Sequence, residues 1–83
     1  MDTQTEVLRI LDEVLSLNGR SKTFRRETHL IGAVPEFDSM AVVSLIAALE
    51  EQLGITLDDS DIDGQVFASV GSLVDLVSDK LAA

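Results

Sequence analysis

Three stretches of the chain carry apolar residues at the three- and four-residue spacing of an amphipathic helix: residues 3–17, residues 39–53 and the stretch after Ser69. No stretch shows a convincing alternation of apolar and polar residues, the pattern of a half-buried strand. The apolar positions are Val7, Leu8, Leu11, Val14, Leu15, Met40, Val43, Leu45, Ile46, Ala47, Leu49, Leu53, Val70, Leu73, Val74, Leu76, Val77 and Leu81. The pattern predicts three main helices and an all-α fold.

Polar residues and glycines mark where these helices begin and end. Thr3 and Glu6 have the spacing of a capping box, and Gly19 follows the first apolar stretch as a C-terminal cap would. We expect Asp38 or Ser39 to cap the second helix at its start, and a glycine to end it at residue 54. Ser69 is placed to cap the last helix.

Two connections separate the helices. Residues 18–38 form a long first loop without a sustained period, in which Leu30, Ile31, Val34 and Phe37 are candidates to pin the chain onto the core. Residues 55–64 form an acidic connection with room for a helical turn. The predicted fold is therefore a small four-helix bundle, with three main helices and a short third helix, and residues 1–83 form a single domain.

Composition narrows the function classes. The chain has no cysteine and one histidine, which excludes a disulfide framework, a thiolate zinc site and a two-histidine metal motif. The first residues lack the basic-then-apolar layout of a signal peptide, and the longest uncharged runs, such as residues 39–49, are too short to span a bilayer. We expect a small, soluble, monomeric protein of the cytoplasm.

The net charge of −9 disfavours nucleic acid and anionic membranes as partners. Residues 36–63 contain eight acids and no base, so this third of the chain carries nearly all of the net negative charge. Such a segment attracts basic partner surfaces, or it consists of solvated acids that keep the protein soluble. Four of the six basic residues lie in the first loop, within residues 20–26, where they bind an anion or a partner, solvate the loop or balance nearby acids.

The junction between the long loop and the second helix is a candidate site. A serine at position 39 would lie among backbone N–H groups that have no acceptor within the helix, and these donors favour an anion such as a phosphodiester on its hydroxyl. The simpler interpretation is that Asp38 and Ser39 are cap residues only.

The surrounding sequence resembles the acyl carrier protein family. In residues 36–55, EFDSMAVVSLIAALEEQLGI, an Asp-Ser pair begins a helix that closes on Leu-Glu-Glu, as in that family. Residues 28–31, THLI, look like the family's anchor in the first loop, and residues 67–73, FASVGSL, look like its entry into the last helix. The resemblance covers nearly the whole chain and accounts for the long first loop.

The resemblance implies a carrier and not an enzyme. By position, Ser39 corresponds to the serine that receives 4′-phosphopantetheine from coenzyme A through a phosphopantetheinyl transferase. The thiol of that arm then holds an acyl group as a thioester for acyl-transferring, acyl-activating or acyl-modifying enzymes with basic docking surfaces, in fatty-acid, polyketide or related pathways. A chain without cysteine has no thiol of its own for this purpose.

The chain departs from the family at several positions near the site. Glu36 replaces a frequent glycine, Met40 replaces leucine, and Ala41 and Ser44 stand where acids are common. Partners would then rely on the remaining acids Glu36, Asp38, Glu50 and Glu51 and on apolar contact, which hints at a specialised carrier.

The alternative is an acidic helical binding module without a prosthetic group. Asp59, Asp61, Asp63 and Gly64 spell the first half of an EF-hand loop, which makes such a module possibly calcium-responsive. Val70 occupies the position that requires a bidentate glutamate, so no metal ligands are assigned. An enzyme is disfavoured and no catalytic residue is assigned, because no nucleophile–base pair or cofactor loop can be assembled from these residues.

Overall fold

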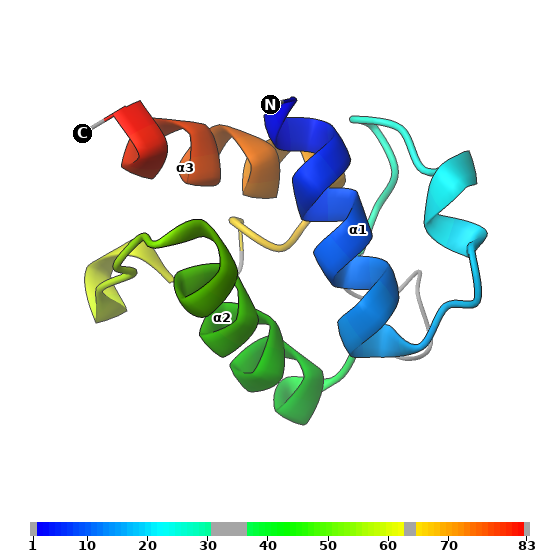
Figure 1. Cartoon of the computed structure of the whole chain (residues 1–83), viewed down its shortest axis with the longest axis horizontal. Coiled ribbons are helices and arrows are strands. Elements are labelled where there is room, and N and C mark those ends of the chain that lie inside the picture. Colours follow the sequence, from blue (N-terminus) through cyan, green and yellow to red (C-terminus); the bar gives the residue numbers. More distant parts are fainter. Residues whose placement is uncertain (1, 31–36, 63–64, 83) are drawn as a thin grey trace.

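The computed structural model describes residues 2–30, 37–62 and 65–82. The helix α1 spans Thr3–Leu15, α2 spans Ser39–Leu53 and α3 spans Val70–Ala82; the 3₁₀ segments η1 (Arg20–Thr23) and η2 (Asp59–Asp61) lie in the two connections (Figure 1). The expected small all-α fold with three main helices is confirmed. The acidic connection contains one helical turn, the three-residue 3₁₀ segment η2. Across the described part of the chain, β-pairing is confined to one isolated bridge between His29 and Ser69.

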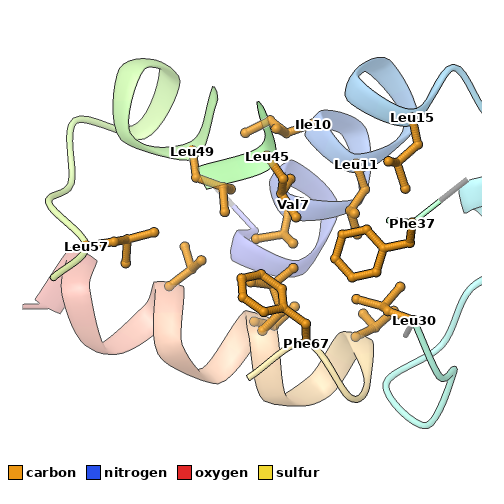
Figure 2. Close-up of a cluster of buried hydrophobic side chains, with 14 of the residues drawn as sticks. Val7, Ile10, Leu11, Leu15, Leu30, Phe37, Leu45, Leu49, Leu57 and Phe67 are labelled. Carbon is orange, nitrogen blue, oxygen red and sulfur yellow. The ribbon is translucent and has the colours of Figure 1, made fainter. Parts of the chain in front are cut away.

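The core lies where the three helices meet. Apolar side chains from α1, α2 and α3 pack together with side chains from the loops (Figure 2). The fully buried side chains are Val7, Ile10, Leu11, Leu17, Leu30, Leu45, Leu49, Val70, Leu73 and Val77. Four of the predicted apolar positions are only partly buried: Leu8, Val14, Leu76 and Leu81. Ile10, which was not among the predicted positions, is fully buried.

The ends of α1 correct two expectations. Its N-cap is Asp2, whose carboxylate accepts the N–H of Thr5, and not the Thr3–Glu6 capping box. The helix ends at Leu15 because Ser16 takes the left-handed conformation, with φ of 54°, and the chain then turns Leu17 into the core. Gly19 lies beyond this turn and is the N-cap residue of η1.

The first loop is fastened to the start of α3. The carbonyls of Arg26 and Thr28 accept the N–H groups of Gly71 and Val70, each at 2.9 Å, and Leu30 donates to the carbonyl of Ala68 at 3.1 Å. A Cβ at position 71 would come within 3.1 Å of the Arg26 carbonyl oxygen, so a glycine permits this close approach. The loop therefore supplies acceptors that the first turn of α3 lacks.

Leu30 and Phe37 are buried, as expected of residues that pin the loop, whereas Ile31 and Val34 lie outside the described residues. Ser69 caps α3 as expected, since its Oγ accepts the N–H of Ser72 at 3.3 Å. Within the described part of the chain, no helix combines the length and apolar character needed to cross a membrane.

Candidate functional site

The start of α2 is defined by Asp38 and Ser39. Ser39 is the first helical residue, and Asp38 is the N-cap in an extended conformation. Oδ1 of Asp38 accepts the N–H of Ala41 at 2.9 Å, and its carbonyl oxygen accepts the N–H of Val42 at 3.0 Å. Of the two cap residues that the sequence offered, Asp38 is the one that caps.

The residue before this cap is anchored in the core. Phe37 is buried and packs edge-to-face against Phe67, with ring centroids 5.7 Å apart and planes inclined at 62°. Figure 2 shows Phe37 between Leu11 and Leu30, with the ring of Phe67 to the left of the Phe37 ring. The backbone that leads into Ser39 is therefore held by an aromatic contact on one side and by the Asp38 cap on the other.

The surface around the start of α2 is open. Asp38 and Met40, on either side of Ser39, are both exposed, and Met40 is 74% exposed. Val43, one turn further, is 63% exposed, and Ala47 continues the same side of the helix at three- and four-residue spacing. This end of α2 is therefore accessible from outside, and its exposed side includes an apolar strip formed by Met40, Val43 and Ala47.

Sequence reasoning did not separate this strip from the core. Met40 and Val43 are apolar like their buried neighbours Leu45 and Leu49, and α2 carries no charge before Glu50. A helix that is apolar on nearly all sides gives no periodic signal for which side faces solvent.

The start of α2 favours an anion. In a helix, the first N–H groups have no intrahelical acceptor, and here Asp38 takes only that of Ala41. The backbone amides of Ser39 and Met40, together with the helix dipole, favour negative charge at this end. Because the chain has no cysteine, a thioester requires a thiol from an attached group.

The acidic connection between α2 and α3 is joined to α3 by an ion pair. Oδ2 of Asp61 lies 2.7 Å from Nζ of Lys80, which ties η2 to the last turns of α3. The hydrogen bond from Lys80 lowers the pKa of Asp61, and the same contact raises the pKa of Lys80. Within the described ranges, no three histidine or acidic side chains are grouped to hold a metal ion. Asp63 and Gly64 of the possible calcium loop lie outside the described residues, as does Glu36.

The chain is similar to known proteins in sequence and in fold. Residues 36–77, which run from just before α2 into α3, match the phosphopantetheine attachment site family. No match is found among curated proteins. The solution structure of holo acyl carrier protein NE2163 from Nitrosomonas europaea is 42% identical, with a TM-score of 0.93 and complete coverage of both chains. The solution structure of a holo acyl carrier protein from Geobacter metallireducens is 30% identical, with a TM-score of 0.79, and the match covers 99% of this chain and 88% of that one.

The family match includes the whole of α2 and its N-cap, and the likeness to the Nitrosomonas protein extends over the whole chain. The chain therefore belongs to the acyl carrier proteins, which bear covalently attached 4′-phosphopantetheine and act as carriers, not as catalysts.

Proposed function

We propose that Ser39 is the residue that bears 4′-phosphopantetheine. The observation that carries this proposal is the position of Ser39 as first residue of α2, between the exposed residues Asp38 and Met40. In the loading reaction, the Ser39 oxygen forms a bond to the phosphorus of the phosphopantetheine arm, the bond to the nucleotide portion of coenzyme A breaks, and the serine proton is released. The amides at the helix start and the helix dipole favour the resulting phosphodiester charge.

Once attached, the group supplies the thiol that holds an acyl chain as a thioester. The protein itself presents this arm from a fixed helix end. The anchor of Phe37 in the core and the Asp38 cap keep that end in one position, so that partner enzymes find the arm at a defined place on the surface.

The proposed partners are a phosphopantetheinyl transferase and acyl-transferring, acyl-activating or acyl-modifying enzymes with basic docking surfaces. The acids Asp38, Glu50 and Glu51 lie at the two ends of α2, and the exposed apolar residues Met40 and Val43 lie between them. A partner that fits this face combines basic groups with a small apolar patch.

The remaining parts of the proposal concern the protein as a whole. Residues 1–83 act as one monomeric carrier domain in the cytoplasm, in a fatty-acid, polyketide or related acyl-transfer pathway. The η2 turn corresponds to the short third helix of a four-helix carrier bundle. The calcium-responsive binding module is not favoured, because the Asp61 carboxylate is engaged by Lys80.

The test is the intact mass before and after incubation with coenzyme A, magnesium and a broad-specificity transferase. We expect the native chain to gain one phosphopantetheine, Ser39→Ala to gain none, and the control Ser44→Ala, an exposed serine further along α2, to gain one. Circular dichroism checks that all three chains are equally helical. Loading of Ser39→Ala would show that the arm is attached elsewhere.

A further inference from the structure

The first loop carries a cluster of positive charge in an otherwise acidic protein. Arg20, Lys22, Arg25 and Arg26 are four of the six basic residues, and no acid occurs between Glu13 and Glu27. The chain as a whole has a net charge of −9. The segment 20–26 is therefore a local region of opposite sign.

Pairing within the protein accounts for only part of this cluster. Arg26 binds Asp75 of α3 through Nη2, at 2.8 and 3.0 Å from the two carboxylate oxygens, and so helps fasten the loop to α3. Lys22 and Arg25 are exposed, and neither forms an ion pair with any residue that the structure describes. Lys22 acts on Asp12 only through Coulombic attraction, which contributes to the lowered pKa of that carboxyl, so both cations can still pair with a partner.

The backbone that bears them is held in place by Asp12. Its carboxylate accepts the N–H of Gly19 at 3.0 Å and both the N–H and the hydroxyl of Ser21, at 3.2 and 2.8 Å. The hydrogen bond from the Ser21 hydroxyl lowers the pKa of Asp12, so the carboxylate stays ionised. Further along, the N–H of Arg25 donates to Oγ1 of Thr28 at 2.8 Å. A partner therefore meets an ordered loop and does not bear the entropic cost of ordering it.

A surface groove adjoins the cluster. It lies between α1 and the loop, has a volume of about 690 Å³, and is lined by Leu8, Asp12, Glu13 and Lys22 among others. Both acids of the wall are engaged within the protein, Asp12 by Gly19 and Ser21 and Glu13 by an ion pair with Arg9 at 3.5 Å. Lys22 belongs both to the cluster and to the groove wall, and Leu8 offers the groove a large apolar side chain. In Figure 1, η1 and the body of α2 lie on opposite sides of α1. The basic cluster and its groove are therefore separate from the exposed strip of α2.

We propose that Lys22, Arg25 and the adjoining groove form a second docking surface, which binds an acidic protein segment that carries an apolar residue. Carboxylates of that segment pair with Lys22 and Arg25, and its apolar side chain enters the groove against Leu8. Nucleic acid and anionic membranes are extended polyanions and would also face the remaining acids of a chain with net charge −9, whereas a short acidic segment can contact this surface alone. The surface has the opposite charge preference to the acidic face around α2, so it selects a different partner or a second part of the same one.

The test uses the full chain labelled with nitrogen-15 and a defined probe, an acetylated peptide of alternating glutamate pairs and single leucines. We expect saturable shifts of the amides of Ser21, Lys22 and Arg25, with the amides at the start of α2 unmoved. The double variant Lys22→Gln/Arg25→Gln should weaken binding roughly tenfold, because two exposed charge pairs are lost. A peptide with serine in place of leucine should also bind more weakly.

The matched control is Thr56→Glu/Ser60→Glu, which changes the net charge by the same amount at two exposed positions in and beside η2. It should bind the peptide within about twofold of the native chain. Three results would overturn the proposal: no saturable shift, equal weakening in both double variants, or shifts at the loop with phosphatidylglycerol vesicles but not with the peptide. The last would indicate a membrane surface in place of a protein.

Discussion

The contact between Phe37 and Phe67 offers a quantitative test of what positions the start of α2. Its centroid distance of 5.7 Å and inclination of 62° fall within the range of favourable edge-to-face pairs, which contribute about 0.5–1.5 kcal/mol beyond the apolar area they bury. Replacement of either ring by leucine keeps an apolar side chain but removes this geometry. We expect each of the single variants Phe37→Leu and Phe67→Leu to lose about 1–2 kcal/mol of unfolding free energy.

The double variant isolates the pair. Because either single change already removes the ring–ring contact, the double variant should lose about 0.5–1.5 kcal/mol less than the sum of the two single losses. For a domain of this size, 1 kcal/mol corresponds to a shift of about 4–8 °C in Tm. Urea denaturation followed by circular dichroism is the suitable assay, since the chain has no tryptophan or tyrosine to report by fluorescence.

The control is Val43→Ala, because Val43 is 63% exposed and should change the unfolding free energy by no more than about 0.5 kcal/mol. If the losses of Phe37→Leu and Phe67→Leu add within about 0.3 kcal/mol, the rings contribute only buried area and the edge-to-face argument is wrong.

Three further predictions concern caps and charges. Asp38→Ala should cost about 1 kcal/mol of unfolding free energy in urea, whereas Asp38→Asn, which can still accept the Ala41 N–H, should cost much less; equal losses would mean that the cap bond contributes nothing. Gly54→Ala should lower the unfolding free energy by about 1–2 kcal/mol, because Gly54 has φ of 67°, which is unfavourable for alanine. An added Cβ would meet no atom within 4 Å, so the whole cost is conformational. An unchanged urea midpoint would contradict this reasoning. The Lys80 contact lowers the pKa of Asp61, so its stabilisation is present above the ordinary carboxyl pKa and is lost as pH falls through the lowered folded value. The urea midpoint of Asp61→Asn should therefore lie below that of the native chain at neutral pH, and the two midpoints should approach each other as pH falls below the ordinary carboxyl pKa of about 4. A difference that stays constant over this acid range would refute the ion pair as its cause.

The bounds of α2 could be predicted because each end carries its own signal. Asp38 is a cap residue before an apolar run and Gly54 is free to adopt positive φ, and both choices are local. The end of α1 could not be predicted in the same way. Ser16 takes a left-handed conformation that serine rarely adopts, and it does so because Leu17 gains a place in the core that only the assembled fold provides.

The candidate site also has features that local sequence predicts and features that depend on the assembled fold. A serine at a helix start is visible in the sequence, and the surrounding motif indicated its role. The exposure of Met40 and the burial of Phe37 against Phe67 depend on where the other elements pack, as does the pairing of Arg26 with Asp75 across more than half of the chain. Such contacts join residues distant in sequence, and no local pattern encodes them.

The hydrogen bonds between the first loop and the start of α3 make these two segments one cooperative unit. Val70 and Gly71 donate to carbonyls of the loop, while Leu30 of the loop donates back to Ala68. Detachment of the loop would therefore leave the first turn of α3 without its acceptors, and fraying of α3 would release the loop. The opening of the two segments is therefore coupled. Because they lie far apart in sequence, folding must close a long loop before these hydrogen bonds form, which slows the folding of a helical protein whose other contacts within helices are local.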